Sequence, residues 1–177
     1  MELAGILDMG PGPARPGQRV KKLDKTDTAP QEAMTQFAAL CFRQKAKAKP
    51  EVLLITSRDT GRWVIPKGWP MKGKSGPECA EREAFEEAGV EGVLIPHCLG
   101  LFTYDKGLDD GALQPCVVSV FPIRVDRLHA IYPEHGQRRR RWFTPAKAAQ
   151  KVAEPELAAL IAAFDPASLP RRPTGKS

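Results

Sequence analysis

The chain has 177 residues, of which 42% are hydrophobic and 27% charged, and its formal net charge is +6 at pH 7. This length is enough for one domain with a hydrophobic core and short tails. Residues 1–10 lack the basic segment and long apolar run of a secretion signal, and no apolar run reaches membrane-spanning length. We therefore expect a soluble, cytoplasmic protein with no membrane partner.

The first predicted region is a flexible arm over residues 1–34, which are rich in Gly, Pro, Lys and Asp and show little apolar periodicity. Three strands are predicted next, over residues 36–42, 52–57 and 63–65. The polar loop 44–50 joins the first two of them.

A helix is predicted between Ser75 and Gly89. Ser75 and Glu78 have the spacing of a capping box, Pro77 lies in the first turn, and Gly89 is typical of a C-terminal stop. The interior contains no Gly or Pro and consists mostly of good helix formers. Small residues recur every four positions and would let the helix pack closely on a sheet: Ala80, Ala84 and Ala88.

The region after this helix predicts strands over residues 93–104, 116–124 and 141–143. Pro96 and Gly100 would interrupt or bend the first of these strands. In the second, Pro122 cannot donate a backbone hydrogen bond and would push the end of the strand to an edge or a bulge.

Two helices are predicted near the end of the chain, one opened by Thr144 and Pro145 and one by Pro155. The second has an apolar stripe that would face the core: Leu157, Leu160, Ile161 and Phe164. Residues 166–177 read as a basic tail. The order of elements predicts an α/β domain over residues 35–165, with a mixed β-sheet and helices packed on its faces.

The four cysteines predict no metal site and no disulfide, because their spacing fits neither. Three lie in apolar runs typical of strands and one lies in the first helix, so we expect buried free thiols: Cys41, Cys98, Cys116 and Cys79. The three histidines, at positions 97, 129 and 135, show no useful partner spacing.

Three carboxylates on the first predicted helix are the strongest functional signal. Glu83, Glu86 and Glu87 lie at i, i+3 and i+4, which places them on one face of one helix. Like charges this close repel one another, and oxygen-rich clusters of this kind typically hold a hard divalent cation such as Mg²⁺. The alternative interpretation is a solvated acidic face.

The residues around these carboxylates resemble the Nudix box, G-x5-E-x7-R-E-U-x-E-E-x-G-U, where U is aliphatic. Gly68 opens the match, and Arg82 to Val90 complete it at the right spacing. One fixed position differs, because Lys74 stands where the family has Glu. Lys74 either contributes to phosphate binding or is a neutral substitution on an exposed loop.

Further stretches are similar to the diphosphoinositol polyphosphate phosphohydrolase branch of the Nudix superfamily: residues 40–43, 51–58, 62–66 and 138–143. The resemblance spans residues 35–165 and implies a Nudix-type α/β/α sandwich. Enzymes of this branch cleave diphosphates on inositol polyphosphates and also cleave dinucleoside polyphosphates. The resemblance therefore implies a metal-dependent hydrolase that cleaves a phosphoanhydride bond in a polyphosphorylated small molecule.

The resemblance also implies the catalytic centre. Glu83, Glu86 and Glu87 would bind Mg²⁺, with Mn²⁺ as an alternative, and the carbonyl of Gly68 would be a further ligand. Arg82 would orient one of the glutamates. The group that deprotonates the attacking water stays open between Glu86, Glu87 and a glutamate outside the box, Glu134, for which an ordinary loop role is the alternative.

The substrate-binding residues are expected among the cations. Residues that match or lie beside phosphate-binding positions of the branch are Arg43, Ser57, Arg58 and Lys67. Residues 138–141 are four consecutive arginines, and alternate side chains of a strand point to opposite faces. We expect Arg138 and Arg140 to reach the cleft, where guanidinium groups suit phosphates.

Other functions stay open. The branch has a basic pair where residues 113–116 read Leu-Gln-Pro-Cys, so dinucleoside polyphosphates are as well supported as inositol pyrophosphates. An RNA 5′-pyrophosphohydrolase is a second enzyme candidate, although no stacking platform favours nucleic acid. A non-catalytic phosphate-ligand sensor on a Nudix scaffold is the candidate of another class. The oligomeric state is not predicted.

Overall fold

The computed structural model describes residues 32–46 and 48–170. Most of the predicted arm, and residues 171–177 of the predicted tail, lie outside the described residues. The helices and strands, in chain order, are β1 Met34–Arg43, β2 Glu51–Thr56, β3 Trp63–Val64, β4 Lys67–Gly68, α1 Gly76–Ala88, β5 Val90–Leu94, β6 Gly100–Gly107, β7 Leu113–Leu128, β8 Arg140–Phe143, α2 Pro145–Ala149 and α3 Pro155–Ala162.

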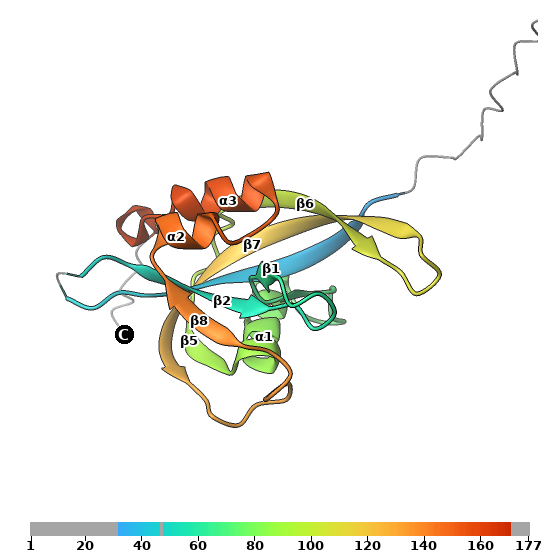
Figure 1. Ribbon diagram of the computed structural model, residues 1–177. Coiled ribbons are helices and arrows are strands. Elements are labelled where there is room, and N and C mark those ends of the chain that lie inside the picture. Colours follow the sequence, from blue (N-terminus) through green and yellow to red (C-terminus); the bar gives the residue numbers. More distant parts are fainter. Residues whose placement is uncertain (1–31, 47, 171–177) are drawn as a thin grey trace, which may run out of the picture. The chain divides into compact units, whose positions relative to one another are not determined.

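The strands form one mixed sheet of eight strands with helices on both faces, as Figure 1 shows. The main strand order is β3-β2-β1-β7-β5, with β8 paired to β2, β4 to β1 and β6 to β7. Only β1 and β7 run parallel among these described pairs, and the others are antiparallel. The prediction of an α/β/α sandwich around a mixed sheet is confirmed.

The two faces of the sheet bury separate cores. Along β1, Ala38 and Leu40 pack with residues of α2 and α3, whereas Ala39 and Cys41 pack with the alanine stripe of α1. All four of these β1 residues are fully buried, because helices cover both faces. The small side chains of the stripe let α1 approach the sheet closely, as the sequence predicted.

One edge of β1 is shared by two strands, and this arrangement positions the functional site. The Phe37–Ala38 segment pairs with β4, while Phe42 and Arg43 pair with β2. The amide of Ala39 donates to the carbonyl of Pro66 at 2.9 Å. The short β4 is therefore held beside β1 and next to α1. The sequence did not predict β4, because two residues are too few for an apolar pattern.

Pro122 is a correction to the sequence prediction, because it lies inside β7 and not at its end. β6 pairs with β7 as far as Val120, and β5 pairs with it from Ile123. Pro122 therefore falls where one partner strand gives way to the next. A missing N–H is tolerated there, and the Pro122 carbonyl still accepts a hydrogen bond from Ile95 N–H at 3.0 Å.

Cys98 is a second correction. It is exposed and lies in the connection between β5 and β6, whereas Cys41, Cys79 and Cys116 are buried free thiols as predicted. The predicted strand over residues 93–104 is interrupted, as Pro96 and Gly100 indicated: β5 ends at Leu94 and β6 begins at Gly100. At the other end, the start of the predicted tail is ordered, since Pro166–Ser168 form a 3₁₀ turn and Leu169 packs against the core. No helix in the described residues is long and apolar enough to cross a membrane.

Candidate active site

A cavity of about 380 Å³ lies between α1, β4 and the segments that precede β3 and β8. It brings together nearly all the residues that the sequence assigned to metal or substrate binding: Ser57, Arg58, Lys67, Gly68, Glu83, Glu86, Glu87 and Arg138. Glu134 also lines it. These residues come from four separate segments of the chain, which the fold brings together.

Capping residues fix where α1 begins and ends, and with it where its acidic face lies. The Glu78 carboxylate accepts hydrogen bonds from Ser75 N–H at 2.7 Å and from the Ser75 hydroxyl at 2.6 Å. At the other end Gly89 has φ of 63°, a conformation that suits glycine, and its N–H donates to Phe85 at 2.8 Å. The helix begins and ends where predicted, and its acidic face is directed to the cavity.

Glu87 is the most buried of the helix carboxylates. Its Oε2 accepts a hydrogen bond from the backbone N–H of Lys67 at 3.1 Å, and its Oε1 is ion-paired with Arg138. Burial raises the pKa of Glu87 to about 7, and the nearby Arg138 and Lys67 only partly oppose this effect. The Glu87 carboxyl can therefore exchange a proton near neutral pH in the cation-free protein.

Glu83 lies directly against β4. A Cβ atom added to Gly68 would stand 2.1 Å from Oε1 of Glu83, so only glycine leaves room for this carboxylate. Burial, followed by the charges of Glu86 and Glu134, raises the pKa of Glu83. Glu83 forms no hydrogen bond or ion pair with any described residue. Glu86, by contrast, accepts from Arg82 Nε at 2.5 Å, which is the orienting contact that the sequence predicted.

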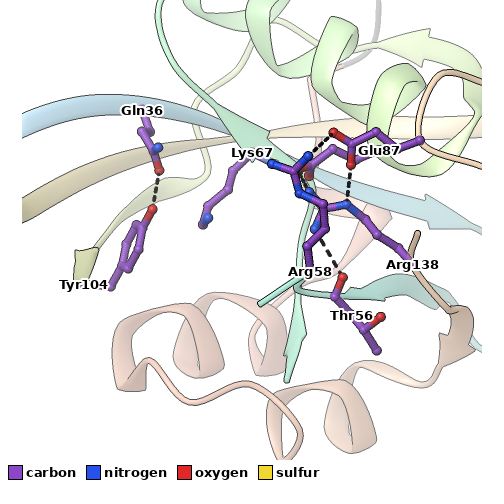
Figure 2. Close-up of polar contacts among 8 residues, drawn as sticks. Gln36, Thr56, Arg58, Lys67, Glu87, Tyr104 and Arg138 are labelled. Carbon is purple, nitrogen blue, oxygen red and sulfur yellow. Dashed lines mark hydrogen bonds and ion pairs between the residues drawn. The ribbon is translucent and has the colours of Figure 1, made fainter. Parts of the chain in front are cut away.

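Arg138 pairs with the carboxylate of Glu87, as Figure 2 shows. Besides pairing with Glu87, it donates to Glu134 Oε2 at 2.6 Å and to the Thr56 carbonyl at 3.2 Å. Its side chain is only 7% exposed. Arg138 is thus a neutralising partner of the buried carboxylates, a role that the sequence could not distinguish from phosphate binding.

Glu134 lies in the cavity wall and not on an ordinary loop surface. Its carboxylate contacts Arg138 and also Arg58, at 3.3 Å from Nη1, and its N–H donates to the Glu86 carbonyl at 3.0 Å. That backbone bond ties the segment before β8 to α1. The position of Glu134 four residues before Arg138 was the only sequence signal for this arrangement.

The donor set fits a hard divalent cation by its chemistry and its location. Three glutamates and Gly68 border one cavity, and among the described residues Glu83 has no cationic partner within ion-pair distance. In residues 32–46 and 48–170, however, no three His, Cys, Asp or Glu side chains converge closely enough to form a metal-binding group. Arg82 and Arg138 engage Glu86 and Glu87 in this arrangement.

Two predicted substrate-binding arginines lie away from the cavity. Arg43 is paired with Glu51 at 2.8 Å and stacks on Trp142, with its guanidinium carbon 4.3 Å from the ring centroid. Arg140 donates to the carbonyls of Ala88 at 2.6 Å and His129 at 3.0 Å. Only one of the four consecutive arginines, Arg138, lines the cavity. β8 begins at Arg140, so its pairing with β2 orients Arg140 and Arg141, whereas Arg138 lies in the segment before the strand.

Lys74 is exposed and does not line the cavity. Its N–H closes a turn with the carbonyl of Met71 at 3.1 Å. The placement of Lys74 favours a neutral substitution on an exposed loop over a part in phosphate binding.

The NUDIX domain family matches residues 34–164 of this chain. Nudix hydrolase 12, mitochondrial, of Arabidopsis thaliana is 35% identical over 103 residues, which are 56% of this chain and 51% of that protein. Diphosphoinositol polyphosphate phosphohydrolase 3-alpha of Mus musculus is 40% identical over 87 residues, covering 48% and 51% respectively. The chain thus spans about half the length of these two curated relatives.

Solved structures show the same fold. An E. coli dihydroneopterin triphosphate pyrophosphohydrolase superposes with a TM-score of 0.58 at 18% identity, covering 75% of this chain and 97% of that one. A C. elegans Ap4A hydrolase binary complex superposes with a TM-score of 0.55 at 20% identity, covering 73% and 93%. These similarities support the fold alone.

Proposed function

The chain belongs to the Nudix family, and on that basis we propose that it hydrolyses a phosphoanhydride bond in a polyphosphorylated small molecule. The observation that carries the proposal is the placement of Glu83, Glu86 and Glu87 in one cavity together with Lys67 and Arg58. A diphosphoinositol polyphosphate or a dinucleoside polyphosphate is the proposed substrate, and the name of one similar protein, a diphosphoinositol polyphosphate phosphohydrolase, agrees with the first of these classes.

Glu83, Glu86, Glu87 and the Gly68 carbonyl are the proposed ligands of Mg²⁺, or alternatively of Mn²⁺. When bound, the cation would neutralise charge on phosphate oxygens and activate the attacking water. Arg82 holds the Glu86 carboxylate in place from the side of the helix.

The cations and hydroxyl that border the same cavity are the proposed phosphate ligands. Lys67 and Arg58 present N–H donors, and Ser57 presents a hydroxyl at the end of β2. Arg43 and Arg140 are not carried into this proposal, because their own contacts keep them outside the cavity.

The proton acceptor is proposed from the carboxylates of the cavity. An effective general base has a pKa near the working pH. In the cation-free protein, burial raises the pKa of Glu87 to about 7, a value that applies to the role of base only where Glu87 is not itself bound to the cation. Glu134 is the competing candidate, and its carboxylate is paired with Arg58 and Arg138. Glu86 remains a third candidate.

A hydrolysis screen tests the proposal. Diphosphoinositol polyphosphates, dinucleoside polyphosphates, nucleotide sugars, nucleoside triphosphates and 5′-triphosphorylated RNA are incubated with Mg²⁺, and the products are identified. We expect turnover of one of the first two classes, complete loss in EDTA, and recovery when Mg²⁺ or Mn²⁺ is restored. Binding without turnover across the panel would favour the phosphate-ligand sensor, and RNA as the best substrate would favour the RNA 5′-pyrophosphohydrolase.

The Gly68→Ala variant should lose most of its activity while keeping its fold. The added methyl group would meet the Glu83 carboxylate at 2.1 Å, and the end of this flexible side chain can move away. Displacement of a reacting group by about 1 Å lowers rates by roughly a hundredfold. Initial rates and Tm are the measurements. The matched control is Gly107→Ala, where no atom lies within 4 Å of the new Cβ. Full activity in Gly68→Ala would show that the position of Glu83 against β4 is unimportant.

The proposal also covers the limits of the catalytic domain and the cellular compartment of the protein. We propose residues 35–165 as the catalytic domain, between an arm over 1–34 and a basic tail over 166–177. The cytoplasm is the proposed compartment, although the name of the Arabidopsis relative assigns that protein to mitochondria. Nucleic acid is not a favoured partner.

A further inference from the structure

One part of the active-site cavity, where β1, β4 and β6 meet, is lined by basic, aromatic and amide side chains and not by carboxylates. The residues there are Gln36, Lys67, Trp69, Tyr104 and Lys106, and we call them the Gln36–Lys106 subsite. The acidic residues that line the cavity come from α1 and from the segments after β2 and before β8: Asp59, Glu83, Glu86, Glu87 and Glu134. Neither β1 nor β6 contributes a carboxylate to the cavity.

Gln36 supplies a hydrogen-bond donor at this subsite. Its side chain lines the cavity although the residue is only 3% exposed. The Tyr104 hydroxyl donates to Gln36 Oε1 at 2.7 Å, as Figure 2 shows. Within the described part of the chain, the amide nitrogen Nε2 of Gln36 has no acceptor. This donor is accessible from the cavity, because Glu154 Oε2 is the only side-chain polar atom of the described residues that is both buried and unpaired, and Nε2 can donate to a ligand oxygen.

Two lysines are held in place by aromatic rings of the same subsite. Lys67 Nζ lies 4.7 Å from the centroid of the Tyr104 ring, and Lys106 Nζ lies 4.8 Å from the centroid of Trp69. Cation–π contacts position an ammonium group without using its N–H donors. Figure 2 shows Lys67 between the Gln36–Tyr104 pair and the Glu87–Arg138 pair.

We propose that the Gln36–Lys106 subsite binds a second phosphate-bearing group of the substrate, remote from the bond that is cleaved. The inference rests on the proposed function. The subsite would select substrates that carry several phosphate groups over substrates whose diphosphate is flanked by neutral nucleosides.

The hydrogen-bond donors of the subsite favour a phosphate over a nucleobase at this position. The amide nitrogen of Gln36 and the two ammonium groups can only donate, and Gln36 Oε1 is already occupied by Tyr104. A phosphate offers acceptors alone, whereas a nucleobase edge presents donors as well as acceptors. Both aromatic rings of the subsite already hold an ammonium group, which leaves less ring surface for stacking.

The sheet register explains why the sequence missed this basic group. Residues 113–116 at the start of β7 contain no lysine or arginine, which argued against a highly phosphorylated substrate. In the structure, Lys106 of β6 lies directly opposite Gln114 of β7. The neighbouring strand therefore supplies a cation at this level of the sheet.

Steady-state kinetics with two substrates test the subsite. A diphosphoinositol pentakisphosphate carries many phosphates, whereas ADP-ribose has a diphosphate between neutral groups. For Lys106→Gln we expect KM for the diphosphoinositol pentakisphosphate to rise about tenfold, because one charged hydrogen bond is lost. The kcat for this substrate should stay within about twofold of the wild-type value. KM for ADP-ribose should change by less than about twofold. Lys147→Gln is the matched control, because Lys147 is an exposed lysine of α2, away from the cavity.

A binding measurement separates this inference from the proposed function. Inositol hexakisphosphate has phosphates but no anhydride, so calorimetry with it reports binding without turnover. We expect binding to the wild type and about tenfold weaker binding to Lys106→Gln and to Gln36→Leu. That result without hydrolysis of any substrate would leave the subsite standing and remove the proposed function. If Lys106→Gln hydrolyses the phosphate-rich substrate with unchanged KM and binds inositol hexakisphosphate as the wild type does, the proposed subsite is wrong. It is also wrong if KM for ADP-ribose rises as much as, or more than, KM for the phosphate-rich substrate.

Discussion

Replacing Glu86 and Glu87 together with glutamine should lower kcat/KM by about a thousandfold or more. Divalent cations contribute several kcal/mol to transition-state stabilisation, and each 1.4 kcal/mol is about a factor of ten in rate. Glutamine keeps the size of both side chains and removes both charges. The loss of activity should therefore arise at the cation, while Tm without cation reports separately the cost of removing the Glu87–Arg138 ion pair.

Two measurements distinguish this result from an unspecific loss. Mg²⁺ should raise Tm of the wild type, because a ligand that binds only the folded state stabilises it, and should not raise Tm of the double variant. Glu81→Gln is the control, since Glu81 is an exposed carboxylate of the same helix that does not line the cavity. Its activity should match the wild type. Near-normal hydrolysis by the double variant would remove the proposal that these glutamates bind the catalytic cation.

Replacing Arg138 with methionine should have the largest effect on stability. The side chain is buried and neutralises Glu87 and Glu134, so its loss leaves buried carboxylates without their main partner. Breaking a buried ion pair in this way costs about 3–5 kcal/mol of the free energy of unfolding. Methionine retains most of the side-chain volume, so the change measures charge and hydrogen bonding more than packing.

The loss of stability in Arg138→Met should be larger at high pH than at low pH, because it depends on the ionisation of Glu87. Burial raises the pKa of Glu87 to about 7, so at pH 5 its carboxyl is largely neutral and has little need of Arg138. At pH 8 the wild-type carboxylate is ionised and depends on the arginine. Denaturant unfolding of wild type and variant at both pH values should therefore give a larger difference at pH 8.

The control for this experiment is an arginine with a weak surface contact. Arg124 is 57% exposed and lies 3.7 Å from Asp126, so Arg124→Met should change stability by less than about 1 kcal/mol at either pH. An Arg138→Met variant as stable as the wild type at pH 8 would contradict the description of Arg138 as the neutralising centre of the cavity.

Local patterns in the sequence predicted much of the fold. The helix from Ser75 to Gly89 needed only capping residues and helix formers, and its alanine stripe predicted which face packs on the sheet. Most strands were located to within a few residues. The exceptions were β4, which is too short for any pattern, and β7, in which Pro122 sits between two partner strands that cannot be known before the sheet is assembled.

The catalytic helix and the cationic side of the site differ in how far sequence could predict them. The spacing of Glu83, Glu86 and Glu87 places three carboxylates on one face of any α-helix, because helix geometry repeats every 3.6 residues. No comparable local rule places Arg58, Glu134 and Arg138 together, since ion pairs between distant segments depend on how the chain folds.

By itself, the sequence determined the acidic helix, the Nudix family and the layered α/β architecture, all of which depend on short-range spacing or on the order of elements. The tertiary structure alone decided which polar groups meet in the cavity. It turned Arg43 and Arg140 to other partners and brought Gln36 and Lys106 to the wall. The physical reason is that strand pairing and register choose the neighbours of a side chain, and both are set by packing across the whole sheet.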